Sequence, residues 1–370
     1  MGSERIRVGI LCGGESPEHE VSLLSAKNIV AALNPSKYEV TIIGISREGE
    51  WGLRHLHHWL INEDNPEKIA LAPASAGLAV QPKGRVGAKN AIVTTESGIT
   101  LPLIDVVFPV LHGPNGEDGT IQGLLRLAHI PFIGPDVLGS SIGMDKDVMK
   151  RLLRDAKVPI APFVSISRQK SSLVSFKAVT KELGPVLFIK PANMGSSVGV
   201  SRADSEESFI AATEEAFRFD DKILIEQEII GQEIECSVIG NEVKRASLPG
   251  KVIPSHTFYS YEAKYLDPDG ASFEIPAILS EGEVKNIQDT AIRTCEVLCI
   301  DGMSRVDMFL KKDGEVLVNE VNTIPGFTRI SMYPKMWEAS GLEYGELLDE
   351  LITLAISRNK KQESRRIVRN

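Results

Sequence analysis

The chain has 370 residues, of which 42% are hydrophobic and 25% are charged, values that are ordinary for a globular protein of two or three domains. Its 50 acidic and 41 basic residues give a formal net charge of −9, which disfavours general attraction to nucleic acid or anionic membranes. No apolar run approaches the ~20 residues of a membrane helix, and no signal peptide precedes the first strand. The four cysteines lack paired spacing. We therefore expect a cytoplasmic protein with reduced thiols and with no nucleic-acid or membrane partner.

The first third of the chain alternates strand and helix patterns. Strands are predicted at residues 5–12, 38–45, 103–111 and 131–133, and helices at residues 18–33 and 118–128. Strands that are separated by helices favour a parallel α/β sheet. Residues 60–98, which are rich in Pro, Ala and Gly, are interpreted as an irregular excursion from that sheet.

After residue 134 the pattern changes to a mixture of helices and strands. Helices are predicted at residues 145–156, 205–219, 281–299 and 343–357, and strands at residues 186–190, 222–228, 233–239, 302–310 and 315–321. The strands at residues 222–228 and 233–239 are expected to form an antiparallel hairpin around Gly231. The basic tail, residues 360–370, is expected to be disordered and solvated rather than a binding arm, because the whole chain is acidic.

Four polar residues alternate along the last two predicted strands. Arg305 and Asp307 share one face of the first strand, and Glu320 and Asn322 share one face of the second. If the two faces coincide, three oxygen ligands of the kind that Mg²⁺ prefers lie together, beside a guanidinium that suits a transferring phosphoryl group. The competing interpretation is a surface hairpin with ordinary charge pairs. The turn at residues 323–328 favours the first interpretation, because its glycine lets backbone N–H groups approach a ligand.

Two lysines and a flexible loop indicate phosphate binding. Lys190 ends a predicted strand and precedes a loop of small residues, 191–200, while Lys146 begins a predicted helix. A point charge beside backbone donors suits phosphate, although each lysine alone is more often a solvated surface group. The loop is not a Walker A motif. The chain also contains no G-x-G, which argues against the dinucleotide fingerprint and against the oxidoreductase that it would indicate.

Three further segments carry polar groups whose purpose the residues alone leave open. Residues 226–233 could pair with an adenine along a strand edge or could be a plain hairpin. The loop at residues 13–22 holds several glutamates, Glu18 among them, and so favours a cationic amine over an anion. His112 follows a later strand and could be a catalyst or a hydrogen bonder that orients its loop. Both loops are expected outside the carboxyl ends of strands, where open α/β sheets bind ligands.

In chain order, these segments closely resemble the D-alanine–D-alanine ligase family of the ATP-grasp superfamily. The resemblance runs from the first strand to about residue 357 and is carried by GGESPEHEVS, LHGPNGEDGTIQG, GMDKDVMKRLL, KPANMGSSVGVS, FYSYEAKY, SRVDMFL and NEVNTIPGFT. It implies an α/β fold of three domains. An N-terminal parallel α/β (pre-ATP-grasp) domain would span residues 1–135, and two α+β domains, residues 136–226 and 227–370, would sandwich ATP. A mobile lid would lie at residues 255–272.

The resemblance also implies roles for individual residues. The residues expected to bind ATP are Lys146, Lys190, Glu226, Gln227, Ile229 and Glu233, where the family often has lysine in place of Gln227. The residues expected to hold two Mg²⁺ (or Mn²⁺) ions are Asp307, Glu320 and Asn322. Glu18 would hold the ammonium of the first D-alanine, with His112 nearby.

The remaining roles concern catalysis and the second substrate. Arg305 and the backbone of Gly326 would stabilise developing negative charge. Ser331 and Met332 would receive the carboxylate of the second D-alanine, while Lys264 and Tyr265 would close over the site from the lid. Glu18, Ser196 and Tyr265 would form a hydrogen-bonded triad that links the three domains.

The activity implied is ATP-dependent ligation of two D-alanine molecules through an acyl phosphate, for peptidoglycan precursor synthesis. A homodimer and activation by a monovalent cation such as K⁺ are also implied. Tyr265 favours an amine nucleophile, because relatives that use D-lactate lack this tyrosine. The rival interpretations are a ligase for D-lactate or another D-amino acid, and a non-catalytic nucleotide-binding module. Such a module should have lost the arginine or a metal ligand, and all four residues are present here.

Overall fold

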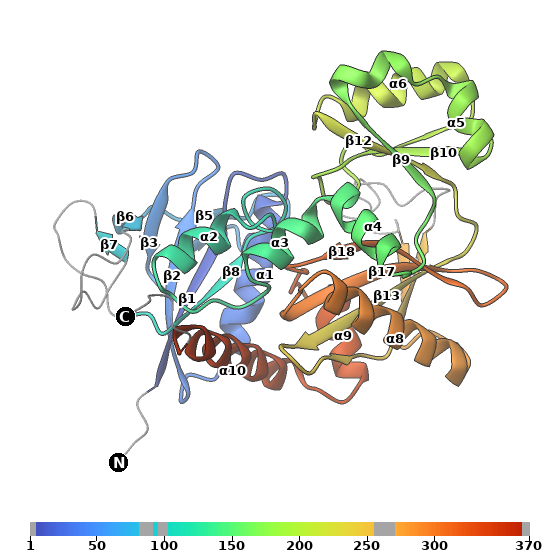
Figure 1. The fold of residues 1–370 in the computed structure, drawn as a ribbon. Helices are drawn as coiled ribbons and strands as arrows, with labels where there is room; N and C mark the ends of the chain where they lie inside the picture. The colour runs from blue at the N-terminus through green and yellow to red at the C-terminus, as the bar shows by residue number, and fades with distance from the viewer. Residues whose placement is uncertain (1–4, 81–91, 95–102, 255–270, 365–370) are drawn as a thin grey trace, which may run out of the picture.

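The computed structural model describes residues 5–80, 92–94, 103–254 and 271–364. The strands of this part of the chain form three main sheets, and a short two-stranded ribbon accompanies the first sheet (Figure 1). None of the helices in the described ranges is long and apolar enough to cross a bilayer. The three sheets correspond to the α/β and two α+β domains that the sequence predicts.

The first sheet is a six-stranded sheet in the order β7-β6-β3-β2-β1-β8, in which β1 pairs in parallel with β2 and β8. The elements of this part of the chain are β1 (Ile6–Gly13), α1 (His19–Ala32), β2 (Tyr38–Ile45), β3 (Trp51–Arg54), β4 (Leu60–Ile61), β5 (Ala70–Leu71), β6 (Ala76–Val80), β7 (Ile92–Thr94), β8 (Val106–Val110) and α2 (Thr120–Leu127). Strands β4 and β5 pair with each other in the separate two-stranded ribbon. Successive residues of β1 enter different cores, because side chains alternate across a strand. Val8 and Ile10 pack with α1, whereas Leu11 packs with α2.

The second sheet has four strands in the order β11-β10-β12-β9. Its elements are β9 (Phe163–Ser167), the 3₁₀ helix η1 (Arg168–Leu173), α5 (Phe176–Leu183), β10 (Leu187–Pro191), β11 (Ser201–Ala203), α6 (Glu206–Ala216) and β12 (Lys222–Gln227). Helices α5 and α6 cover one face through a core that includes Leu187 and Ile189. The alternate residues of β10, Phe188 and Lys190, therefore face the opposite side, where they line a cleft.

The third sheet has the order β16-β15-β13-β17-β18, with β14 paired to β13. Its strands are β13 (Gln232–Gly240), β14 (Arg245–Ala246), β15 (Gly250–Pro254), β16 (Ala271–Glu274), β17 (Gly302–Leu310) and β18 (Val316–Asn322). The helices around it are α3 (Val137–Met144), α4 (Lys146–Asp155), α8 (Glu281–Val297), α9 (Met332–Ala339) and α10 (Tyr344–Glu363). Val306 and Met308 of β17 enter a core with α4 and α8, so that Arg305 and Asp307 face the cleft.

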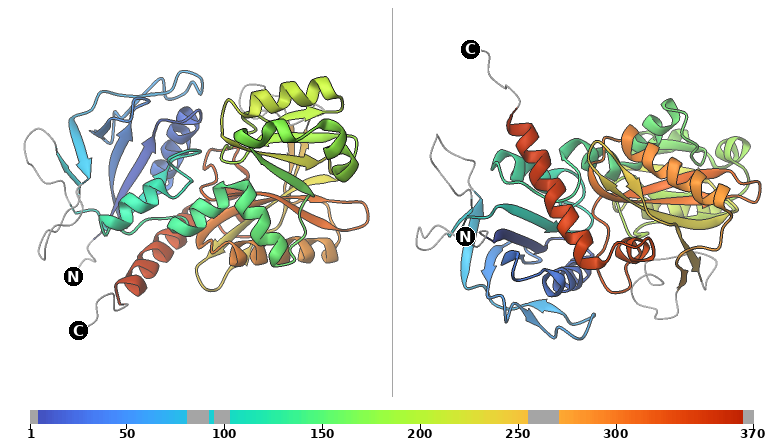
Figure 2. Two further views of the ribbon diagram at one scale, coloured as in Figure 1. Left: turned by 45° about the horizontal axis from the view of Figure 1, so that its top comes forward. Right: turned by 90° about the horizontal axis from the view of Figure 1, so that it is seen from below.

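The last helix returns to the first sheet. Leu347, Leu351 and Ile352 of α10 are buried in the same core as Val8 and Ile10 of β1, and both views of Figure 2 show α10 beside the first sheet. These three side chains are about 1% exposed or less, so the packing holds the C-terminal helix against the N-terminal sheet. The N-terminal sheet is therefore completed by C-terminal residues.

Several predicted elements are confirmed with shifted ends, and some are wrong. The predicted hairpin of residues 222–228 and 233–239 does not form, because β12 pairs with β9 and β10 whereas β13 pairs with β14, β15 and β17. At Gly231 between them, an added Cβ would lie 2.8 Å from the carbonyl oxygen of Leu310. The strand predicted at residues 131–133 is reduced to one bridge between Val107 and Phe132.

Other differences concern length and packing. The irregular excursion predicted at residues 60–98 contains the short strands β4 to β7. The first residues of the basic tail, 360–363, extend α10 rather than being disordered, while residues 365–370 lie outside the described ranges. The domain limits stay a prediction. Helix α4, which was assigned to the central domain, contributes Met149 and Leu153 to the core of the third sheet.

Leu351→Ala is expected to destabilise the protein by about 2–5 kcal/mol, because the change leaves a cavity in the core that α10 shares with the first sheet. Urea unfolding followed by circular dichroism measures this. The exposed residue Thr353 of the same helix supplies the control, and Thr353→Ser should change stability by less than about 0.5 kcal/mol. Equal effects of the two changes would show that α10 is not part of the N-terminal core.

Candidate functional site

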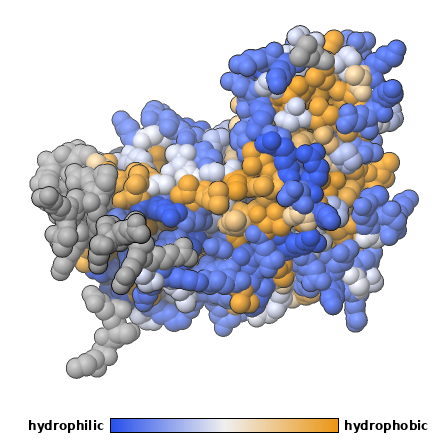
Figure 3. Space-filling view, viewed as in Figure 1, coloured by the Kyte–Doolittle hydropathy of each residue, from blue (hydrophilic) through white to orange (hydrophobic). Residues whose placement is uncertain are grey.

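One cleft gathers the predicted site residues. It has a volume of about 1270 Å³ and is lined by residues of the second and third sheets, of α1, and of the loops around the first sheet; these include every predicted site residue that the structure describes. In Figure 3 apolar side chains gather where the lobe of the second sheet meets the rest of the molecule. The volume exceeds the roughly 300–1,000 Å³ of an ordinary ligand pocket, so more than one substrate can be held. Lys264 and Tyr265 lie outside the described residues.

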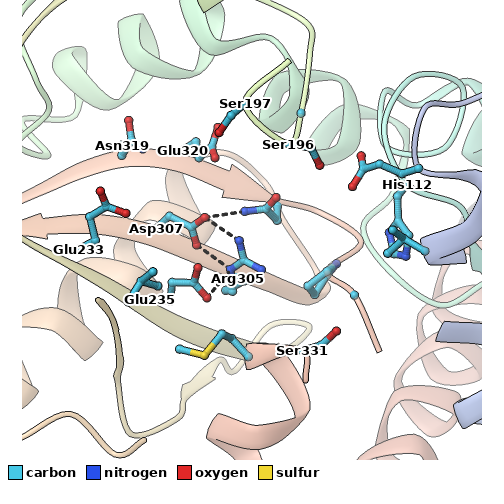
Figure 4. A pocket seen from close by; sticks show the side chains of 18 of the residues that line it. His112, Ser196, Ser197, Glu233, Glu235, Arg305, Asp307, Asn319, Glu320 and Ser331 are labelled. Carbon is cyan, nitrogen blue, oxygen red and sulfur yellow. Dashed lines mark hydrogen bonds and ion pairs between the residues drawn. The ribbon is translucent and has the colours of Figure 1, made fainter. Parts of the chain in front are cut away.

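The hairpin of β17 and β18 brings its four polar residues together as predicted. Arg305 is paired in register with Asn322, and Asp307 with Glu320. The Arg305 guanidinium donates to both oxygens of Asp307 at 2.7 Å, and Asn322 Nδ2 donates to Asp307 Oδ2 at 2.9 Å (Figure 4). Asp307 is thus held by two neighbours on the same sheet face. The condition on which the sequence prediction depended, that the two faces coincide, is met.

An irregularity in this hairpin adds a residue that the sequence analysis missed. The register shifts between Asp307 and Met308, so that Glu320 and Val318 lie opposite consecutive residues of β17. A bulge of this kind re-aims a side chain. Both Asn319 and Glu320 line the cleft, and Asn319 Oδ1 accepts from Lys190 Nζ at 3.1 Å. Strict alternation would have turned Asn319 away.

Arg305 is surrounded by carboxylates. Its Nε lies 3.0 Å from Glu235 Oε2, on the neighbouring strand β13. Burial alone would lower the pKa of Arg305, but the charges of Asp307 and Glu235 outweigh it and hold that pKa well above its usual value. The guanidinium is therefore a permanent positive charge in the floor of the cleft. Glu235 was not singled out from the sequence, because a glutamate in a strand carries no signal of its own.

The donor set of the hairpin fits a hard divalent cation. Asp307 and Glu320 offer carboxylate oxygens, and Asn322, whose nitrogen donates to Asp307, offers its amide oxygen. Oxygen ligands of this kind suit Mg²⁺ or Mn²⁺. Among the described residues, no three His, Cys, Asp or Glu side chains are grouped as a metal site by themselves. The two carboxylates instead pair with cationic side chains, Asp307 with Arg305 and Glu320 with Lys146.

The two predicted phosphate lysines lie in this cleft and are nearly buried. Lys146 Nζ donates to the carbonyl oxygen of Met194 at 2.6 Å and lies 3.2 Å from Glu320 Oε2. Lys190 Nζ lies 2.7 Å from Glu226 Oε2. Each lysine thus reaches from one element of the cleft to another. The interpretation of these lysines as separate solvated surface groups is wrong.

The N-terminal loops approach the same cleft. At Gly13 (φ +93°) an added Cβ would lie 2.2 Å from the carbonyl oxygen of Ile45, so only glycine fits the turn that leads into α1. Glu18, which is buried at the start of that helix, has its Oε2 3.6 Å from the Cβ position of Gly195 and 3.4 Å from that of Gly113. The Glu18 carboxylate is therefore enclosed by the glycine-rich loops that follow β8 and β10.

The Gly/Ser loop after β10 has an unusual backbone. Ser196 and Ser197 adopt positive φ angles of 53° and 60°, a conformation that non-glycine residues rarely take. Strain of this kind clusters at ligand sites. Ser196 lines the cleft and directly follows Gly195, whose Cβ position is 3.6 Å from Glu18 Oε2. The triad of Glu18, Ser196 and Tyr265 stays a prediction, because Tyr265 is outside the described residues.

A buried glutamate joins the N-terminal loops to the turn after β18. Glu117 Oε2 accepts from the Gly113 N–H at 2.8 Å, and its Oε1 accepts from the Ile324 N–H at 3.0 Å. His112 Nδ1 donates to the Ile324 carbonyl oxygen at 2.9 Å, and its Nε2 lies 3.3 Å from Ser25 Oγ. Burial lowers the pKa of His112. A neutral imidazole held in this way orients the loop, as one of the two sequence interpretations proposed.

The same turn contains Gly326, and the atoms around it explain why this position is a glycine. An added Cβ at Gly326 would lie 2.8 Å from Ser331 Oγ. Ser331 Oγ accepts from the Thr328 N–H at 2.9 Å, and the Phe327 N–H donates to Ser25 Oγ at 3.1 Å. The turn is thus fixed on both sides while the backbone of Gly326 lines the cleft. Such a fixed N–H group can meet developing negative charge without reorganisation.

Two further buried groups were missed by the sequence analysis. Glu117 lies within LHGPNGEDGTIQG, the segment that drew attention to His112, and its spacing after His112 could have suggested a second loop-fixing residue. Lys150 lies on α4 with its Nζ 3.1 Å from Glu226 Oε1, and it is fully buried. A lysine four residues after Lys146 reads as a surface charge in the sequence, and only the packing of α4 reveals its burial.

Glu117 supplies a pH prediction. Burial and the nearby Glu18 charge raise the pKa of Glu117 from 4.5 to about 7. An acid whose pKa is raised on folding stabilises the protein most below its unfolded pKa, and this contribution is lost as the pH rises through the folded pKa. Relative to Glu117→Gln, the wild type should therefore lose on the order of 3 kcal/mol of stability between about pH 4.5 and pH 7. Urea unfolding of both proteins at several pH values tests this. A stability difference in favour of the wild type that grows with pH would contradict it.

Comparison with known proteins agrees with this geometry. Two family models match the chain, D-ala D-ala ligase N-terminus over residues 7–135 and D-ala D-ala ligase C-terminus over residues 152–353. The D-alanine–D-alanine ligase of Oceanobacillus iheyensis is 50% identical over 357 residues, which cover 96% of this chain and 97% of the relative. D-alanine–D-alanine ligase A of Escherichia coli K12 is 48% identical over 356 residues, which cover 96% and 97%.

Solved structures give the same result. The D-alanine–D-alanine ligase from Coxiella burnetii matches with a TM-score of 0.81 and 37% identity, covering 97% of both chains. The VanG D-Ala:D-Ser ligase from Enterococcus faecalis matches with a TM-score of 0.82 and 34% identity, covering 95% of this chain and all of the other. The chain therefore belongs to the D-alanine–D-alanine ligase family and has its three-domain ATP-grasp fold.

Proposed function

We propose that this chain joins two D-alanine molecules to D-alanyl-D-alanine, with ATP converted to ADP and phosphate, and that it thereby supplies peptidoglycan synthesis. One observation carries the proposal. A single cleft brings together the phosphate lysines, the oxygen-rich hairpin, and the Glu18 and Gly326 regions. Nucleotide, metal and amino-acid substrates can therefore meet in one cleft. The relatives that are about 50% identical over nearly the whole chain carry the same activity in their names.

The nucleotide is assigned to the space between the second and third sheets. Gln227, Ile229 and Glu233 line the cleft where the chain passes from one sheet to the other, and they would hold the adenine and ribose. Lys146 and Lys190 would contact the phosphates. In the structure these lysines pair with Glu320 and Glu226. A phosphate bound in the cleft would become the partner of Lys146, and Glu320 would then be available to hold a metal ion.

Asp307, Glu320 and Asn322 would hold two Mg²⁺ or Mn²⁺ ions. When bound, the ions would neutralise charge on the transferring phosphoryl group. The chain's own contribution is to fix the Asp307 carboxylate in advance, through the hydrogen bonds that Arg305 and Asn322 donate to it. A monovalent activator such as K⁺ is part of the proposal on family resemblance alone.

The reaction then has two steps. A carboxylate oxygen of the first D-alanine attacks the γ-phosphorus of ATP. The bond between the γ-phosphorus and the oxygen that bridges it to the β-phosphate breaks. ADP is the leaving group, and an acyl phosphate is formed. The amine of the second D-alanine attacks the acyl carbon and loses a proton, and the tetrahedral intermediate expels phosphate. Glu18 would hold the first ammonium, and Ser331 and Met332 would receive the second carboxylate. Arg305 and the Gly326 N–H would stabilise the oxyanion.

The choice of second substrate is the main alternative within this family. One of the matched structures is a D-Ala:D-Ser ligase, and its fold is as similar as that of a D-alanine–D-alanine ligase. The proposal of D-alanine follows the sequence relatives at about 50% identity and Tyr265, the lid residue that favours an amine over D-lactate. Lys264 and Tyr265 are proposed to close over the site and exclude water from the acyl phosphate.

Location and assembly are proposed on separate grounds. The free thiols Cys12, Cys236, Cys295 and Cys299 favour a reducing compartment, and a reaction that consumes ATP fits the cytoplasm. A homodimer is proposed from the family, and light scattering of the purified chain tests it.

The proposed reaction is tested by phosphate release from Mg-ATP with D-alanine, L-alanine, D-alanine plus D-serine, or D-alanine plus D-lactate, with product masses recorded. Release that depends on D-alanine alone, with a D-alanyl-D-alanine product, is the expected result. A requirement for D-serine or D-lactate would contradict the assigned second substrate while leaving the ATP-grasp chemistry in place. ATP binding without phosphate release in any mixture would support the binding-module interpretation.

Glu320→Gln is expected to lower kcat by at least about 100-fold, because it removes a charged oxygen ligand at the phosphoryl-transfer site. The fold should stay intact, with an unchanged circular dichroism spectrum. The matched control is Glu315→Gln, at the exposed turn of the same hairpin, where the carboxylate pairs with Lys311 and kcat should not change. Near wild-type turnover of Glu320→Gln would remove Glu320 from the metal site.

A further inference from the structure

Lys150 lies behind the phosphate lysine Lys190, with one carboxylate between them. It is fully buried on α4, and its Nζ is 3.1 Å from Glu226 Oε1. The other oxygen of Glu226 is 2.7 Å from Lys190 Nζ. Lys190 lines the cleft, whereas Lys150 is not among the cleft-lining residues. The three side chains, from α4, β12 and β10, form a buried Lys–Glu–Lys row that ends at the cleft.

The charges of this row do not cancel. Two ammonium groups share one carboxylate, so the row carries an excess of one positive charge. Burial by itself would raise the pKa of Glu226, but Lys150 and Lys190 together lower it, which keeps the carboxylate ionised. Charges interact more strongly in a buried site than in water. An anion in the cleft, next to Lys190, is therefore the natural partner for the excess charge.

The row is a poor device for stability alone. Burial lowers the pKa of Lys150 to about 8, so keeping its ammonium charged has a cost. Buried ion pairs can often be replaced by apolar residues without loss of stability. A second lysine behind Glu226 does, however, change the net charge that the cleft presents to a ligand at Lys190. Without Lys150, the Glu226 carboxylate would be left to neutralise Lys190, and the net charge of the row would fall to zero.

We propose that Lys150 is a positioning residue that holds the Glu226 carboxylate from behind, so that Lys190 presents an uncompensated positive charge to the nucleotide phosphates. The inference rests on the assignment of Lys190 to the phosphates in the proposed function. It also changes the part played by Glu226, whose carboxylate orients the lysines and leaves adenine and ribose to its neighbours. Helix α4 then serves the phosphates twice, through Lys146 directly and through Lys150 one turn later.

Calorimetric binding of ADP and of adenosine separates this role from a structural one. In Lys150→Met, ADP should bind at least about 10-fold more weakly, a loss of about 1.4 kcal/mol, while adenosine, which has no phosphate, binds within about 2-fold of wild type. KM for ATP should rise more than kcat falls. Lys150→Arg, which keeps the charge, should restore ADP binding. The matched control is Arg151→Met, which removes a cation from the exposed side of the same helix and should leave both affinities unchanged.

A double-mutant cycle tests whether Lys150 acts through Glu226. In a Glu226→Gln background no carboxylate remains to neutralise Lys190, so adding Lys150→Met should change ADP affinity by less than about 3-fold. If Lys150→Met alone does not fold, a loss of ADP affinity of more than about 3-fold on adding Lys150→Met to Glu226→Gln still overturns the proposal. Equal losses in both backgrounds, or unchanged ADP binding by folded Lys150→Met, would overturn the proposal. If wild-type protein binds ADP no more tightly than adenosine, the phosphate assignment of Lys190 fails first, and the role of Lys150 fails with it.

Discussion

The pairing of opposite charges inside one cleft is the constraint on which the rest of the site depends. Lys146 and Lys190 come from α4 and β10, and they are paired with Glu320 of β18 and Glu226 of β12. Charges removed from water must find partners. Each of these basic groups therefore pairs with an acidic one from a different element. The groups that would bind phosphate and metal hold one another in place.

These ion pairs form only if elements from distant parts of the chain keep fixed positions relative to one another. Helix α10 completes the core of the first sheet, and Glu117 ties the loop after β8 to the turn after β18 through two backbone N–H groups. Phe327, in the same turn, packs its ring against Phe108 and Tyr333. The Gly326 backbone is thereby fixed from both the N-terminal and the C-terminal side. The fixed position of this backbone, which we propose as an oxyanion donor, is a consequence of domain packing rather than of a local motif.

The sequence predicted the fold class, most long helices and strands, and the convergence of the motif residues. Alternation and motif order were sufficient there, because Arg305, Asp307, Glu320 and Asn322 obey a period of two. It failed where tertiary contacts decide. Helix α3 was missed because it contains Gly139 and Gly143, at each of which an added Cβ would lie 2.6 Å from a neighbouring residue. Three residues were missed because their positions leave no periodic signal. Asn319 faces the cleft because of a bulge, Lys150 lies on a buried helix face, and Glu117 bonds to a distant turn.

The central claim is that the ion pairs of the cleft are replaced when substrates bind. The acidic residues of the hairpin would then bind metal, and the basic residues would bind phosphate. The most direct measurement is Mn²⁺ binding, followed by electron paramagnetic resonance, with and without ADP. The account predicts weak binding of Mn²⁺ alone, because Asp307 and Glu320 are paired with Arg305 and Lys146. Binding should be at least about 10-fold tighter with ADP. An Mn²⁺ affinity that is the same with and without ADP would contradict the exchange.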